Sequence, residues 1–182
     1  GGAGRDFALL NLADPGTPID PALERAFLVQ PGARHGDPSV RPQVWLVNSA
    51  RLQEDELAHA ALVVAQSRTL MPGIKLGRRI EAAADDWKPQ PVDTAKGRMP
   101  WPHFVKLDQV RVKAMREAEL SPEWNVLARV EERPWLAVRE APSNPGRTGL
   151  WVWLASEPLA ETNWPNDAGF VVFFAELSRQ AL

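Results

Sequence analysis

Polar residues that follow apolar runs are the side chains of this sequence best placed to do chemistry. In an open α/β sheet, ligands bind in the crevice beyond the carboxyl ends of the strands. Four apolar runs of this sequence are predicted strands, and polar side chains follow each of them. The pattern therefore predicts a polar cleft formed by Asp14, Asn48, Ser67, Ser156 and Glu157.

A hydrolase is one use of such a cleft, with Ser67 or Ser156 as the nucleophile. Ser67 follows the third apolar run, but its neighbours Gln66 and Arg68 are not the small residues that a tight nucleophile turn prefers, and Gly-x-Ser-x-Gly is absent. The sequence has no cysteine, which excludes a thiol nucleophile and thiolate metal sites. We therefore expect no catalytic residue, with a hydrolase or a small-ligand binding module at the cleft as the alternatives.

Neither the histidines nor the glycines of the sequence form a motif that predicts a metal or cofactor site. His35, His59 and His103 lie in three different segments. Glu56-x-x-His59 has the spacing of a ferritin-like metal site, but no second copy supplies the other half. Neither glycine-rich phosphate-binding motif occurs in the sequence. We therefore expect neither a metal ion nor a cofactor.

Composition excludes several further classes of protein. The 182 residues fit one domain, 1–182, with 21 Lys and Arg against 23 Asp and Glu. Because these charges are spread over both halves, the basic patch of a nucleic-acid-binding protein is missing. No apolar run approaches the length of a membrane-spanning helix. The Gly1-Gly2-Ala3-Gly4 start predicts a piece excised from a longer protein.

Hydrophobic patterning predicts the elements that would position the cleft. Apolar runs at residues 6–12, 44–47, 61–65 and 150–155 are typical of strands, and the last must be central because an edge strand exposes one side to water. Residues 61–65 could instead continue the helix before them, and we favour the strand because turn residues follow. Residues 53–60 predict one or two helical turns, and residues 125–131 and 134–140 a β-hairpin. The proline-rich residues 85–102 predict a long crossing loop.

Two longer helices have clear start signals. Asp20-Pro21 reads as an N-cap and first helical residue, followed by an apolar stripe at helical spacing. Asn166 or Asp167 can cap a final helix from about residue 169, whose apolar stripe includes Phe170, Phe173 and Phe174. Strands alternating with helices predict an α/β fold, a three-layer sandwich with a mostly parallel central sheet plus a β-hairpin.

Residues 101–182 carry a pattern of a known family. It begins at residues 102–112 (PHFVKLDQVRV), continues through a strand pair, and closes with residues 151–156 (WVWLAS), Asn163-Trp164-Pro165 and residues 170–174 (FVVFF). This pattern resembles the C-terminal part of bacterial membrane proteins of the aerotolerance-regulator type. These proteins pair a von Willebrand factor A-type domain with a class I glutamine amidotransferase-like domain.

The resemblance implies a class I glutamine amidotransferase-like fold in a membrane-associated parent protein, with this domain on the extracytoplasmic side. Amidotransferase activity is not carried over, because its cysteine nucleophile is missing. The leading hypothesis is thus a non-catalytic interaction or assembly domain. Its partner would be an unknown protein, with other domains of the same parent chain as candidates. Nucleic acid is not expected as a partner. Contact with the membrane is expected only through other parts of the parent protein.

The corner Asn163, Trp164 and Pro165 allows two interpretations. Pro165 restricts Trp164 to an extended backbone just before the final helix. If Trp164 covers the phenylalanine stripe of that helix, it is a structural staple. If it is exposed, the corner is an interaction surface for a partner. We favour the staple.

Overall fold

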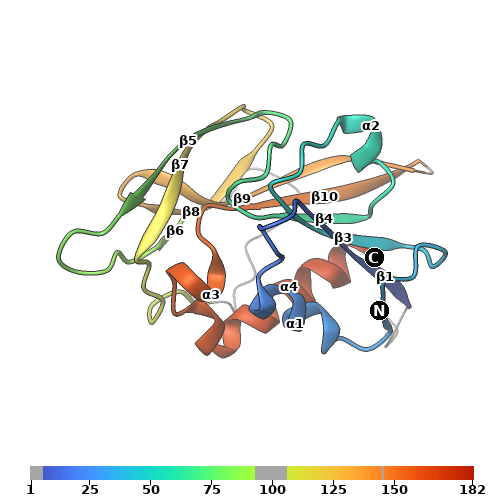
Figure 1. Cartoon of the computed structure of the whole chain (residues 1–182), viewed down its shortest axis with the longest axis horizontal. Helices are drawn as coiled ribbons and strands as arrows, with labels where there is room; N and C mark the ends of the chain where they lie inside the picture. Colours follow the sequence, from blue (N-terminus) through green and yellow to red (C-terminus); the bar gives the residue numbers. More distant parts are fainter. Residues whose placement is uncertain (1–5, 93–105, 145) are drawn as a thin grey trace.

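The central feature of the fold is a mixed eight-stranded sheet. The computed structural model describes residues 6–92, 106–144 and 146–182. The sheet has the strand order β2-β1-β3-β4-β10-β9-β8-β6 (Figure 1). Neighbours from β2 to β10 are parallel, and those from β10 to β6 are antiparallel. The strands are β1 (Phe7–Ala13), β2 (Ala33–His35), β3 (Gln43–Asn48), β4 (Leu62–Ala65), β6 (Gln90–Pro91), β8 (Asn125–Val130), β9 (Arg133–Ser143) and β10 (Arg147–Leu154).

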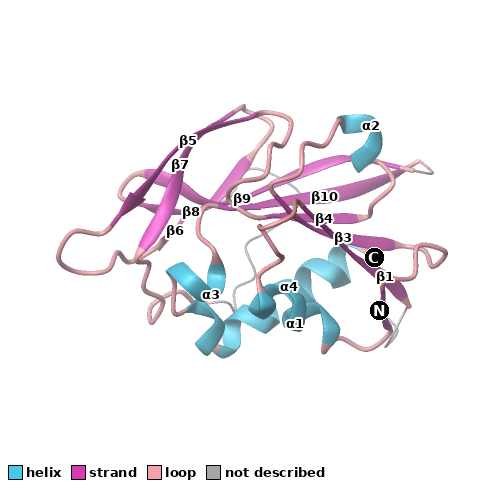
Figure 2. Cartoon of the chain, viewed as in Figure 1, coloured by secondary structure: helices cyan, strands magenta, loops and turns pink. Residues whose placement is uncertain are grey.

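The two faces of this sheet are covered differently. The helices on one face are α1 (Pro21–Leu28), α3 (Pro158–Glu161), the 3₁₀ turn η1 (Trp164–Asn166) and α4 (Ala168–Ala181) (Figure 2). On the other side lie the short helix α2 (Glu54–Leu57) and a separate antiparallel ribbon of β5 (Ile74–Glu81) and β7 (Ala114–Leu120).

The α/β class and the parallel strands are confirmed, whereas the expected helical layer on both faces is not what the structure shows. The β3–β4 connection holds only the four-residue α2. The connection from β4 to its parallel neighbour β10 is used instead to build the β5–β7 ribbon and the antiparallel half of the sheet. One face therefore has no full helical layer.

Strand β10 is central, as its apolar run predicts. Val152 and Trp153 are both 0% exposed. β4 pairs with β10 in parallel on one side and β9 pairs with it antiparallel on the other. Of the two strands that pair with β10, only β4 comes from the N-terminal half of the chain, whereas both were expected to come from it.

Side-chain caps begin the two longer helices where the sequence predicts. Asp20 Oδ1 accepts from the backbone N–H groups of Ala22 at 2.8 Å and Leu23 at 3.4 Å. Asp167 Oδ1 accepts from the N–H of Gly169 at 2.8 Å, which selects Asp167 over Asn166 as the cap of α4. These bonds satisfy N–H groups that the first helical turn leaves without partners.

The β8–β9 hairpin is confirmed, with a turn at Glu131 and Glu132 whose φ angles are 48° and 69°. Two positive φ angles in succession suit the right-handed twist of the flanking strands. Strands β2, β5 and β7 were not predicted, because charged residues interrupt the apolar positions of each and none contains a long apolar run. Strand β6 lies inside the predicted crossing loop, of which residues 93–102 fall outside the described ranges.

A polar cleft at the carboxyl ends of the parallel strands

A cleft of about 350 Å³ lies at the carboxyl ends of the parallel strands, between them, α3 and the β5–β7 ribbon. Five segments supply its walls: the β1–α1 loop, the end of β3, the turn after β4, the ribbon and α3. The polar and charged residues that line it are Thr17, Asp20, Asn48, Gln66, Ser67, Arg68, Arg79, Arg116, Glu157 and Glu161.

Three of the five predicted cleft residues line this site. They are Asn48, Ser67 and Glu157. Asp14 does not line it: its backbone carbonyl accepts from Thr17 in the exposed turn after β1. Ser156 is also not among the residues that line the cleft, because its hydroxyl is bonded in the core.

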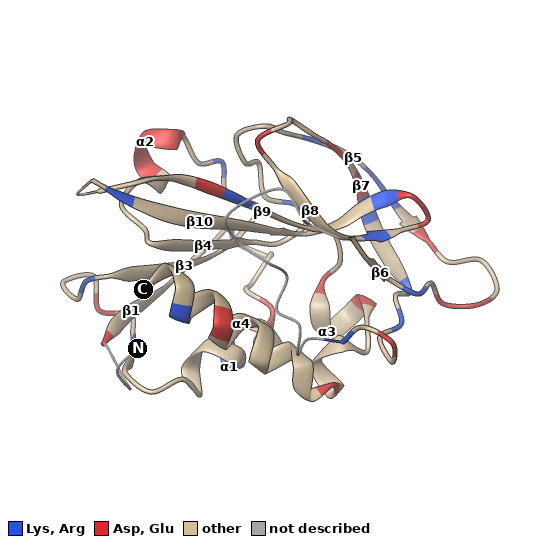
Figure 3. Cartoon of the chain, turned by 180° about the vertical axis from the view of Figure 1, so that it is seen from behind, with Lys and Arg blue, Asp and Glu red and all other residues tan. Residues whose placement is uncertain are grey.

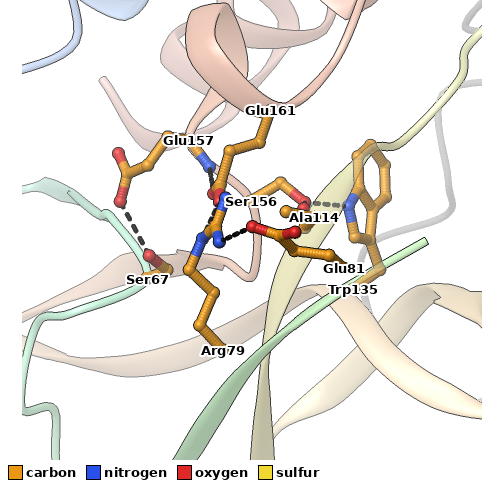
Figure 4. Close-up of polar contacts among 8 residues, drawn as sticks. All are labelled: Ser67, Arg79, Glu81, Ala114, Trp135, Ser156, Glu157 and Glu161. Atoms are coloured by element: carbon orange, nitrogen blue, oxygen red, sulfur yellow. Dashed lines mark hydrogen bonds and ion pairs between the residues drawn. The ribbon is translucent and has the colours of Figure 1, made fainter. Parts of the chain in front are cut away.

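Ser156 is a structural residue with two buried partners. Its Oγ donates to the backbone carbonyl of Ala114 at 2.6 Å and accepts from Trp135 Nε1 at 2.9 Å (Figure 4). Ser156 is 3% exposed. The side chain therefore joins β7 to β9 and cannot reach a substrate in the cleft.

Glu157 is the centre of the cleft's hydrogen-bond network. Ser67 Oγ donates to Glu157 Oε1 at 2.7 Å (Figure 4). Gln66 Nε2 donates to the other carboxylate oxygen. Burial raises the pKa of Glu157, and the nearby Glu161 and Asp20 carboxylates raise it further. The bonds from Ser67 and Gln66 act in the opposite direction but do not cancel the effect of burial.

We expect Glu157→Gln to remove a pH-dependent loss of stability. The folded-state pKa lies above the ordinary value of 4.5, so the folded state holds the extra proton between these two values. Stability therefore falls as pH rises through this window. Urea unfolding from pH 4 upwards should show this step in the wild type and not in Glu157→Gln, since the glutamine amide can still bond with Ser67 and Gln66.

The exposed Glu119 on β7 provides the control for that series. Glu119→Gln should follow the wild-type curve throughout. An unchanged pH slope in Glu157→Gln would show that burial does not perturb this carboxyl.

Glu161 ties α3 to the ribbon. Arg79 Nε donates to Glu161 Oε2 at 2.6 Å, and the backbone N–H of Glu157 donates to Oε1 at 2.8 Å. Arg79 also pairs with Glu81, and these two carboxylates raise the pKa of its guanidinium. The side chain of Glu161 is 8% exposed, so Arg79 supplies the opposite charge that its burial requires.

Asp20 has a similar structural role on the far wall. Besides capping α1 through Oδ1, it accepts the backbone N–H of Leu159 at Oδ2, at 2.8 Å. Its own backbone N–H donates to Gln66 Oε1 at 3.0 Å. Every carboxylate oxygen of Asp20, Glu157 and Glu161 thus accepts at least one hydrogen bond from the protein.

Two arginines, in contrast, keep donors without acceptors. Arg116 donates through Nη1 to the carbonyl of Gly77 at 2.8 Å, while its buried Nε has no acceptor. Arg68 is exposed in the cleft wall and has no acceptor among the described residues. Because Arg116 Nε is enclosed by protein atoms, a ligand in the cleft can reach only the other N–H groups of these two guanidiniums. The cleft therefore offers hydrogen-bond donors.

Sequence patterns alone did not identify seven polar residues of this cleft: Thr17, Asp20, Gln66, Arg68, Arg79, Arg116 and Glu161. Arg79 and Arg116 come from β5 and β7, the ribbon that was not predicted. Asp20 was predicted only as a helix cap. The position of Gln66 next to Ser67, at the end of a predicted buried strand, was the one signal that could have included it.

The backbone at Ser67 is not that of a hydrolase nucleophile. The non-glycine residues with positive φ in the described ranges are Ser49, Glu131 and Glu132, so Ser67 lacks that strained backbone. No histidine lines the cleft in the described part of the chain. Within the same ranges, no group of three His, Cys, Asp or Glu side chains is arranged to hold a metal ion.

The corner before α4 is a staple. Trp164 is 1% exposed, and its ring centroid lies 5.0 Å from Phe170, 5.6 Å from Phe173 and 5.9 Å from Phe174. Asn163 holds the approach to the corner, accepting from the backbone N–H of Arg111 at 2.6 Å. The alternative of an interaction surface at this corner is wrong for the Trp164 ring, because the core already covers it.

Comparisons with known proteins inform the fold. No protein-family model matches the sequence, and no curated protein matches it. The cytoplasmic protein STM1381 from Salmonella typhimurium LT2 is similar in structure with a TM-score of 0.60 and 8% identity, over 96% of this chain and 99% of that chain. The cytoplasmic protein STM3548 from Salmonella typhimurium has a TM-score of 0.60 and 7% identity, over 97% and 99%.

A third solved structure is the N-terminal domain of mmIFT52, with a TM-score of 0.52 and 10% identity, over 96% of each chain. At these identities the likeness is one of fold. In the described ranges, none of the helices combines the length and the apolar character that crossing a membrane requires.

Proposed function

We propose that this chain is a non-catalytic α/β binding domain and that its binding site is the cleft at the carboxyl ends of β1, β3, β4 and β10. The observation that carries this proposal is the division of roles in the cleft. Its three carboxylates are all engaged by protein donors, whereas Arg68 and Arg116 line the cleft without an ion pair among the described residues. A ligand that fits brings hydrogen-bond acceptors, such as a carboxylate or a peptide carbonyl.

The same chemistry serves an interaction role and a small-ligand role. Guanidinium groups bind a free carboxylate and the acceptors of a protein segment alike. An assembly role in a membrane-associated parent protein, with this domain on the extracytoplasmic side, is supported by the sequence resemblance of residues 101–182. The partner in that case is another domain or protein that places an acidic segment in the cleft.

A hydrolase is the second candidate, on the observation that Ser67 Oγ lies 2.7 Å from Glu157 Oε1. A carboxylate at that distance can act as a general base. Three features disfavour it: Ser67 is 4% exposed, Gln66 occupies the other carboxylate oxygen, and the Ser67 backbone is unstrained. Turnover of p-nitrophenyl acetate or glutamine that disappears in Ser67→Ala would establish this candidate over the first.

Binding is tested by NMR titration of the ¹⁵N-labelled protein with succinate and, separately, a short acidic peptide. We expect saturable shifts of the cleft amides at Thr17, Asn48 and Ser67. Arg116→Met should weaken the binding about tenfold or more, because a hydrogen bond to a charged group is lost.

Arg78→Met is the matched control, since Arg78 lies on the same ribbon but pairs with Glu117 at the surface. It should leave the titration unchanged. Tighter binding of the peptide than of succinate would favour a protein partner, and the reverse a small ligand. Cleft amides that respond to neither probe would contradict the proposal.

A further inference from the structure

A second cavity, of about 400 Å³, lies at the opposite edge of the sheet. Its walls come from the residues before β3, the turn before β4, the β9–β10 turn and the end of α4. These are the amino-terminal ends of the parallel strands. Since the six residues of β3 span roughly 20 Å, this cavity is separate from the strand-end cleft.

The ionisable side chains that line this cavity are those of two arginines and a histidine. Arg41, Arg147 and His59 line it, and no Asp or Glu side chain is among its described lining residues. None of the ion pairs among the described residues includes any of the three. The cavity is therefore a local concentration of positive charge on a chain whose net charge is −2. We call it the basic pocket.

The basic groups come from three separate segments and lie around the opening. Arg41 donates through Nη1 to the carbonyls of Pro38 and Val40, which anchors it beside its own loop and leaves its other N–H groups available. Arg147 is the first residue of β10, the strand labelled in Figure 3, and pairs in register with Ser143. His59 follows α2 and is exposed.

The backbone at the floor of the pocket is closely packed. Ser143 Oγ donates to the carbonyl of Ala60 at 3.0 Å. A side chain at Gly149 would bring a Cβ within 3.1 Å of the Ala61 carbonyl oxygen and of Ser143 Cβ. The strands therefore approach closely at this edge of the sheet, and the basic side chains extend from a close-packed backbone.

We infer that the basic pocket binds a small molecule that carries a phosphate group. Two guanidinium groups and an imidazole from different directions suit a tetrahedral, multiply charged anion better than a single planar carboxylate. Pro42, Ala61 and Ala181 add apolar wall for the uncharged part of the ligand. The volume lies in the range of small-ligand pockets, roughly 300–1,000 Å³.

The experiment is isothermal titration calorimetry with inorganic pyrophosphate at constant ionic strength. The wild type should bind at one saturable site. Arg41→Met and Arg147→Met should each weaken binding about tenfold or more, because each removes a charge-assisted hydrogen bond. Arg25→Met removes the same charge from the exposed surface of α1 and should leave the affinity unchanged.

Three outcomes would overturn the inference. The first is no saturable binding of pyrophosphate, in which case the two arginines only offset the negative end of α4. The second is an equal loss in Arg25→Met, which would mean non-specific charge attraction. The third is tighter binding of citrate than of pyrophosphate, which would mean a carboxylate site. Because Arg116→Met should not affect this titration, its result is independent of the strand-end cleft.

Discussion

Trp164→Ala is expected to reduce the free energy of unfolding by about 3–5 kcal/mol, the range for truncating a buried aromatic side chain. The ring is 1% exposed and lies among Trp135, Phe170, Phe173 and Phe174. Its removal leaves a cavity between the sheet and α4, because the surrounding rings are themselves held by the sheet and the helix. Urea unfolding at neutral pH measures the change.

Val172→Ala on α4 is the control for this variant. Val172 is 41% exposed, so its truncation should change stability by no more than about 0.5 kcal/mol. Trp164→Phe should lie between the two, because it keeps most of the ring and removes an indole N–H that has no acceptor among the described residues. A Trp164→Ala variant as stable as Val172→Ala would show that the corner is not a staple.

Ser156→Ala is expected to reduce the free energy of unfolding by about 2–4 kcal/mol, although it removes a single oxygen atom. The hydroxyl satisfies both the Trp135 indole N–H and the Ala114 carbonyl in a buried site. A buried polar group left without a partner costs about 1–3 kcal/mol. Thermal or urea unfolding should show the loss with no change in any ligand titration of the cleft.

A double-mutant cycle separates this hydrogen bond from packing. In Trp135→Phe the indole N–H is already gone, so adding Ser156→Ala should cost clearly less than it does in the wild type. Equal costs in the two backgrounds would show that the bond from Trp135 to Ser156 contributes nothing. The same variants distinguish Ser156 from Ser67, whose partner Glu157 lines the cleft rather than the core.

Local patterns were enough to predict the parts of the fold that bury apolar side chains. Consecutive apolar residues identify β3, β4 and β10, because a strand covered on both faces must be apolar throughout. The helix caps at Asp20 and Asp167 were also readable, since unpaired N–H groups of a first turn select such side chains. The ribbon was not predicted. The apolar alternation in β5 is interrupted by a register shift between Leu76 and Arg79, and the two strands are held by pairing between distant segments, which the sequence of either one does not reveal.

Some residues of the candidate site could likewise be predicted from the sequence, and others could not. The positions of Asn48, Ser67 and Glu157 at the carboxyl ends of the parallel strands could be predicted, because strand ends follow from the apolar runs. The burial of the Ser156 side chain in the core, and the approach of Arg79 and Arg116 to the cleft from the ribbon, depend on how distant segments pack. The physical reason is that a strand end is a local property of the chain, whereas the partner of a charge depends on which distant segments burial brings together.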